Sequence, residues 1–175
     1  MTGQAWLTLA LFLGALVALA YPLAIYLARI ADAKPIGGIC GKVERLIYRA
    51  SGIDAAQEMP WTRYAVALLL FNALGVVVVY LVQRLQVWLP LNPQTLVNVT
   101  PDSAFDTAVS FVTNTNWQGY AGESTMSYFT QMIALAVQNF FSAASGLAVA
   151  FALMRGFARR SSQGIGSFWV DLTRG

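Results

Sequence analysis

The chain has 175 residues, of which 57% are hydrophobic and 11% charged, and its formal net charge is +3. Soluble domains carry roughly 25% charged residues, so this composition indicates an integral membrane protein. There is no histidine and one cysteine, Cys40, which excludes a disulfide framework, a Cys/His zinc site and a His-based catalytic triad within this chain.

The first predicted element is a transmembrane helix within residues 1–28, which contain no charged residue. The run at 5–27 is long enough to cross a hydrocarbon core of about 30 Å. A cleaved signal peptide is the competing interpretation, because Ala-Leu-Ala at 18–20 resembles a cleavage site. Arg29 and Lys34 follow the run, however, and no Lys or Arg precedes it. This polarity is the reverse of a signal peptide and favours a membrane span.

Residues 29–63 are predicted to form a loop that contains the amphipathic stretch KVERLIYR at 42–49. The simplest interpretation is an interfacial helix whose cations, Lys42, Arg45 and Arg49, are attracted to anionic lipid. A docking surface for a partner protein is the alternative.

Two further apolar segments, 64–83 and 128–154, predict transmembrane helices. The first carries Asn72 and Gly75 in its interior, which is typical of a helix that packs against protein on one side. The second has a polar face made of Gln131, Gln138, Ser142 and Ser145. We expect this face to join helices, to support a structure formed by the preceding loop, or both.

The distribution of Lys and Arg predicts the orientation. Six lie between the first two spans, four follow the third, and the loop 84–127 contains one, Arg84. The positive-inside rule therefore places the N-terminus outside, residues 29–63 and 155–175 in the cytoplasm, and residues 84–127 outside.

Within the outer loop, Thr100 as N-cap and Pro101 at the first helical position predict a helix over 100–112. At roughly 16 Å it is half the length of a span. The polar stretch SFVTNTNWQGYAGE at 110–123 follows. A half-length helix and a polar loop between two full spans are typical of a re-entrant pore loop, with the partially negative end of the helix toward a cation. A helix and loop lying on the outer surface is the alternative.

With these residues in view, the chain resembles the potassium-binding subunit of the bacterial Kdp potassium-transporting P-type ATPase. The matching stretches are WLPLNPQ (88–94), DTAVSFVTNTNWQGYAGE (106–123), QNFFSAASG (138–146) and WVDL (169–172). The resemblance implies an all-α membrane protein related to potassium channels, in which one extra helix precedes four helix–pore loop–helix repeats. This chain would contain three transmembrane helices, one re-entrant pore helix and one filter loop. We therefore expect it to be the N-terminal portion of a longer protein or an early-terminated product.

The resemblance also assigns candidate site residues. It places five residues in the filter segment 113–119: Thr113, Asn114, Thr115, Asn116 and Gln118. We expect the backbone carbonyls of 113–116 to bind potassium, with side-chain oxygens as the alternative, and Gln118 to stand at the outer mouth, where the other repeats have glycine. Four residues are expected to support the filter: Gly119, Ser110, Gln138 and Ser142. Asp106 and Glu123 either attract cations to the entrance or act as ordinary hydrogen-bond acceptors.

The implied function is potassium binding and translocation in an ATP-driven uptake complex of the bacterial inner membrane. Another subunit would hydrolyse ATP, and small accessory subunits would complete the complex. We expect no cofactor beside the transported K⁺, no transition metal and no nucleic-acid partner. The rival class is an intramembrane enzyme that uses paired carboxylates, here Asp102, Asp106 and Glu123, but the sequence shows no nucleophile, metal-ligand spacing or phosphate-binding loop to go with them. GGICGK at 37–42 has Ile36 and Val43 where a phosphate-binding loop requires Gly and Ser or Thr. The alternative function is a non-transporting scaffold or regulatory subunit whose polar loop packs on partner protein.

Overall fold

The computed structural model describes residues 3–32, 34, 36–158 and 164–175, and these contain helices and no strand. Three helices in this part of the chain are long and apolar enough to cross a membrane: α1 (Gly3–Ala31), α3 (Trp61–Arg84) and the continuous helix Thr130–Ala158. The prediction of an all-α fold with three transmembrane helices is confirmed. The chain divides into two units, residues 1–53 and 54–175.

The first unit contains α1 and α2 (Gly38–Ser51). Helix α1 continues three residues beyond the predicted limit at residue 28, and Ile30 is the one residue of it that is buried. Helix α2 extends past both ends of the predicted stretch 42–49. It ends at Gly52, whose φ of 64° is left-handed and whose N–H donates to the carbonyl of Tyr48, as is usual for a glycine that terminates a helix.

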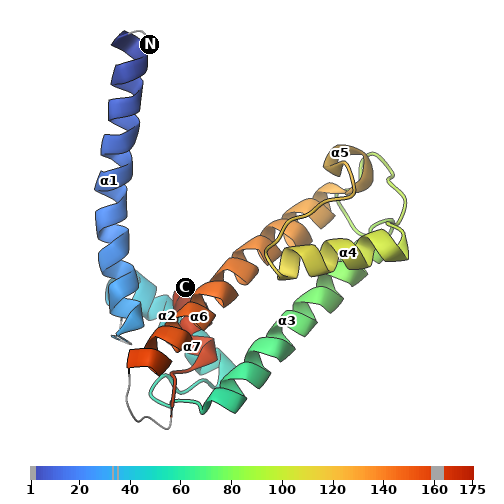
Figure 1. The fold of residues 1–175 in the computed structure, drawn as a ribbon. Coiled ribbons are helices and arrows are strands. Elements are labelled where there is room, and N and C mark those ends of the chain that lie inside the picture. Colours follow the sequence, from blue (N-terminus) through green and yellow to red (C-terminus); the bar gives the residue numbers. More distant parts are fainter. Residues whose placement is uncertain (1–2, 33, 35, 159–163) are drawn as a thin grey trace. The chain divides into compact units, whose positions relative to one another are not determined.

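In the second unit, α3 and α6 (Val137–Ala158) are antiparallel, and α4 (Pro101–Val112) lies across one end of both (Figure 1). A buried core fixes this arrangement and consists of Val79, Val99, Ala104, Ala108, Phe111, Met126, Ala134 and Leu135. Pro101 begins α4, as predicted. Thr100 is at the N-cap position, but its side chain makes no capping hydrogen bond.

The third span begins as a π-helix, η1 (Thr130–Ala136), and continues as α6. A turn of helix, α5 (Gly122–Thr125), precedes it. π-helical turns are rare, and those within α-helices frequently occur at functional sites. The sequence pattern predicted one uninterrupted α-helix here.

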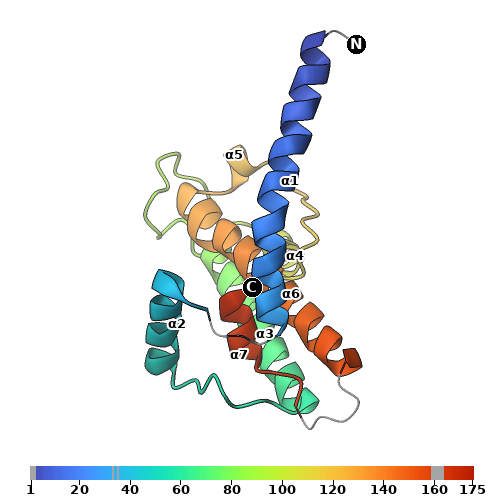
Figure 2. The same cartoon turned by 90° about the vertical axis from the view of Figure 1, so that its left-hand side faces the viewer.

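At the other end of the unit, α7 (Phe168–Arg174) packs against α3 and α6 (Figures 1 and 2). Its anchor is Phe168, which is fully buried and meets the rings of Tyr64 and Phe71 edge to face. This helix contains the WVDL stretch and was not expected as a packed element of the segment 155–175.

Candidate functional site

The loop after α4 is organised around the backbone of Ser110, a residue with no exposed surface. The carbonyl oxygen of Ser110 accepts hydrogen bonds from the N–H of Thr115 at 3.0 Å and of Asn116 at 3.3 Å. The N–H of Asn114 donates to the carbonyl of Phe111 at 3.3 Å. Three successive N–H groups of the loop therefore point back at the C-terminal end of α4.

The direction of these N–H groups fixes the direction of the carbonyls. The peptide bonds are trans, so the carbonyl of each preceding residue points away from the N–H of the same peptide plane. The carbonyl oxygens of Thr113, Asn114 and Thr115 consequently face away from α4. No residue that the structure describes donates a hydrogen bond to them, and residues 113–119 are exposed. The loop therefore presents three successive carbonyl oxygens that have no hydrogen-bond donor among the described residues.

The asparagines of the TNTN sequence allow this backbone path. Asn114 and Asn116 have φ of 54° and 51°, in the left-handed region that asparagine tolerates better than most non-glycine residues. Thr113, between α4 and Asn114, has φ of −82°. The resemblance places these asparagines in the filter segment, but no pattern in the sequence predicted their backbone conformation.

The threonine side chains of the loop turn toward the helix. The hydroxyl of Thr113 donates to the carbonyl of Val109 at 2.8 Å and lies 2.9 Å from the hydroxyl of Thr115. The hydroxyl of Thr115 also lies within 3.3 Å of the carbonyl of Ser110. These contacts hold the loop in shape and direct both threonine hydroxyls toward α4.

Four other residues were assigned to the filter, its support or its entrance: Gln118, Gly119, Asp106 and Glu123. The side-chain amide of Gln118 donates to the hydroxyl of Tyr120 at 3.3 Å. A Cβ at Gly119 would meet no atom within 4 Å. Packing therefore does not require glycine at this position. Asp106 and Glu123 are exposed, and their role stays a prediction.

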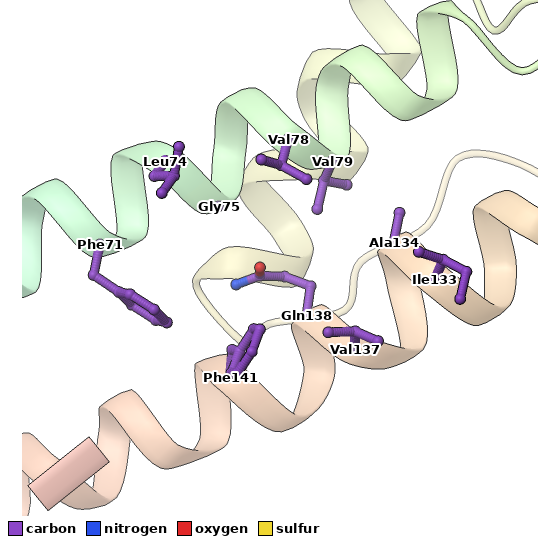
Figure 3. A pocket seen from close by; sticks show the side chains of 10 residues that line it. All are labelled: Phe71, Leu74, Gly75, Val78, Val79, Ile133, Ala134, Val137, Gln138 and Phe141. Carbon is purple, nitrogen blue, oxygen red and sulfur yellow. The ribbon is translucent and has the colours of Figure 1, made fainter. Parts of the chain in front are cut away.

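Gln138, predicted to support the filter, is 5% exposed and lies between α3 and α6 (Figure 3). A Cβ at Gly75 would come within 2.9 Å of its Oε1 atom, so glycine at this position admits the amide between the helices. The amide lines a cavity of about 140 Å³ whose other walls are mainly apolar. Its Nε2 atom is buried and has no hydrogen-bond partner among the described residues.

Gln138 and Ser142 make no hydrogen bond with the loop in the part of the chain that the structure describes. Ser142 donates to the carbonyl of Asn139, within its own helix, at 3.1 Å. The structure therefore groups Ser110 with residues 113–118 and sets Gln138 and Ser142 apart from them.

Sequence reasoning missed Gln86, which is fully buried just after α3. Its Nε2 atom donates to the carbonyls of Thr125, at 2.9 Å, and Val97. Its Oε1 atom accepts from the N–H of Ser127 and the hydroxyl of Thr130, both at 3.1 Å. One amide thus connects the outer loop to the start of the third span. Its position after an apolar run was the only signal in the sequence.

An ion pair at the opposite end was also missed. Arg155, 6% exposed, forms two parallel hydrogen bonds with the carboxylate of Asp171, at 2.7 and 2.8 Å. The hydroxyl of Tyr64 lies 3.1 Å from the same carboxylate. Gly166 has φ of +103°, and a Cβ there would collide with the Arg155 guanidinium. Glycine is therefore required beside this ion pair.

The burial of arginines bears on the predicted membrane orientation, which depends on the cations that flank each span. Two of the four arginines counted after the third span, Arg155 and Arg174, are buried, and Arg155 is paired within the protein. The other two, Arg159 and Arg160, lie outside the described residues. The predicted orientation therefore depends mainly on the six cations between the first two spans.

Comparison with known proteins identifies relatives of the whole chain. A family model described as the potassium-transporting ATPase A subunit matches residues 10–175. Curated relatives named potassium-transporting ATPase potassium-binding subunit include those of Herminiimonas arsenicoxydans, 61% identical over 99% of this chain, and Methylibium petroleiphilum, 62% identical over 99%. The relative from Herpetosiphon aurantiacus is 57% identical over 99%. The chain spans 29%, 31% and 30% of the length of these three relatives.

Proposed function

Because the chain belongs to the family of potassium-transporting ATPase A subunits, we propose that the loop 113–118 binds potassium as one part of a channel-like filter. The observation that carries this proposal is the outward direction of three successive carbonyls, those of Thr113, Asn114 and Thr115. A filter of this kind replaces the hydration shell of an ion by backbone carbonyls. This chain would supply one repeat of the filter.

The electrostatics of α4 favour a cation at this loop. The C-terminal end of a helix carries a partial negative charge, and the loop begins at that end of α4. The residues 100–112 would then form a re-entrant pore helix and not a surface helix. Gln118, next to the carbonyls, would stand at the outer mouth.

The remaining expectations follow from the relatives' printed function. We propose that the chain acts in a multi-pass complex of the bacterial inner membrane, with its N-terminus outside and its C-terminus in the cytoplasm. Another subunit would hydrolyse ATP and receive the K⁺ ion, and small accessory subunits would join them. Lys42, Arg45 and Arg49 are exposed on α2, where they would contact anionic lipid headgroups.

The test uses a full-length relative in which this chain replaces the matching residues, assembled with its partner subunits; we refer to it as the chimeric complex. Gln118→Arg places a bulky cation at the loop. We expect it to reduce the apparent affinity for K⁺ sharply while assembly is retained, since a cation repels the ion. Potassium-stimulated ATP hydrolysis and uptake at low external K⁺ measure the effect.

Gln94→Arg is the matched control, because Gln94 is an exposed glutamine in the outer loop, outside the candidate site. It should leave the apparent affinity unchanged. A scaffold whose polar loop packs on partner protein predicts a different result for Gln118→Arg: weakened assembly with normal K⁺ affinity in the complexes that form. Unchanged uptake at low external K⁺ would remove Gln118 from the site.

A further inference from the structure

A polar hollow is lined by residues of α4, the candidate filter loop, α5 and the third span. Its volume is about 220 Å³, and its lining includes Phe111, Gln118, Tyr120, Gln131 and Asn139. Gln131 fixes one wall, because its Nε2 atom donates to the carbonyls of Gly122, at 3.2 Å, and Met126, at 2.9 Å. Gln118, a filter candidate, and Asn139, on α6, line the same hollow.

Tyr120 connects Gln118 to the interior of the repeat. Its ring packs against the buried core formed by α3, α4 and η1, while its hydroxyl accepts the hydrogen bond from the Gln118 amide. Burial raises the pKa of the Tyr120 hydroxyl, and the hydrogen bond with Gln118 acts in the opposite direction. The phenol therefore stays neutral at physiological pH and keeps its proton to donate.

The Tyr120 hydroxyl has a hydrogen to donate, and the side chain of Asn139 has an oxygen that can accept one. The hydroxyl of Tyr120 uses one lone pair to accept from Gln118, and the described residues offer no acceptor for its hydrogen. In the same hollow, the Oδ1 atom of Asn139 is buried and has no donor among the described residues. Buried polar atoms without a protein partner are usually satisfied by ordered water. A water needs roughly 10–15 Å³, so the hollow that both residues line is large enough to hold one.

We propose that Tyr120 is a positioning residue for Gln118, held in turn by a water-mediated hydrogen bond to Asn139. The chain of contacts runs from the filter loop through Tyr120 to α6. The ring of Tyr120 is fixed by the core, so its hydroxyl orients the Gln118 amide at the outer mouth. This inference rests on the proposed function of Gln118 in potassium binding.

The experiment compares Tyr120→Phe, Gln118→Ala and the double variant in the chimeric complex. Tyr120→Phe keeps the ring and removes the hydroxyl. We expect it to weaken the apparent affinity for K⁺ roughly two- to tenfold, the range of one neutral hydrogen bond, with the maximal ATPase rate and assembly unchanged. In the Gln118→Ala background the same substitution should have no further effect, because the group that Tyr120 positions is absent.

Tyr80→Phe is the matched control. Tyr80 packs against the same core from α3, and its hydroxyl has no hydrogen bond to a residue that the structure describes. Asn139→Ala should weaken K⁺ affinity in the same direction as Tyr120→Phe and should add little to it in the double variant.

The outcomes separate this inference from the proposed function. If Gln118→Ala leaves K⁺ affinity unchanged, Gln118 has no part in binding and the functional assignment of Gln118 fails. If Gln118→Ala weakens affinity while Tyr120→Phe does not, the positioning role alone is wrong. The proposed chain of contacts is also wrong if the effect of Tyr120→Phe on K⁺ affinity adds fully to that of Gln118→Ala or of Asn139→Ala.

Discussion

The hydroxyl of Ser110 donates a hydrogen bond of 3.0 Å to the carbonyl oxygen of Trp117, seven residues further along the chain. The backbone carbonyl of the same serine accepts from Thr115 and Asn116. Ser110 thus holds both the middle and the far end of the loop against α4. Its two roles use different atoms, so they can be separated by substitution.

Ser110→Ala removes the hydroxyl and leaves the backbone carbonyl in place. We expect the end of the loop near Trp117 to loosen at a cost of about 0.5–1.5 kcal/mol, the net value of a typical hydrogen bond. In the chimeric complex this should lower the apparent K⁺ affinity and reduce discrimination against Rb⁺. Ser103→Ala, near the other end of α4, is the control. Equal effects of the two substitutions would contradict a specific role for Ser110.

Substitutions of Asn116 distinguish backbone from side-chain ligands. Asn116→Gly removes the side chain but suits the φ of 51°, so K⁺ affinity should persist if carbonyls are the ligands. Asn116→Val should weaken it, because left-handed backbone costs a residue with a Cβ about 1–2 kcal/mol, and β-branched residues adopt it least readily. Potassium-dependent ATPase titrations measure both. Loss of binding in Asn116→Gly would assign the side-chain amide as a ligand.

Gln138→Met tests whether this buried amide is needed for stability. Its Nε2 atom has no partner among the described residues, and an unsatisfied buried donor costs about 1–3 kcal/mol. Methionine has a similar volume without that donor, so we expect the thermal stability of the purified complex to be unchanged or higher. A clear loss of stability would show that Gln138 meets a partner elsewhere in the complex.

Asp171→Asn tests the buried ion pair with Arg155. Removing one partner of a buried ion pair is strongly destabilising, and we expect a loss of about 3–5 kcal/mol. The double variant Arg155→Met/Asp171→Leu should be more stable than Asp171→Asn, because it removes both charges. Thermal unfolding in detergent measures this order.

The control for this comparison is the exposed pair of Lys34 and Asp32, joined at 2.8 Å. Asp32→Asn should cause no measurable change in stability, since exposed ion pairs contribute little. Comparable losses from Asp32→Asn and Asp171→Asn would contradict the importance of burial.

Local sequence was sufficient to predict the long elements. Three uncharged apolar runs required helices that cross a membrane, because a backbone in lipid must satisfy its own hydrogen bonds. Pro101 similarly marked the start of α4, since proline lacks the N–H that a first helical turn leaves unpaired anyway. The polar TNTN segment was identified as the candidate site by its composition and by resemblance.

The tertiary structure decided what the polar residues do. Gln138 and Ser142 share a helical face with other polar residues, yet they make no hydrogen bond to the loop among the described residues, whereas Ser110 makes several. No comparable pattern in the sequence pointed to Gln86 or Asp171, because their partners are distant in the chain. Thr130 is 44 residues from Gln86, and Tyr64 is 107 residues from Asp171. Periodicity assigns a residue to a face of its own helix. Only the packing of α3, α4 and α6 determines which donor meets which acceptor, and hence which way the carbonyls of the loop point.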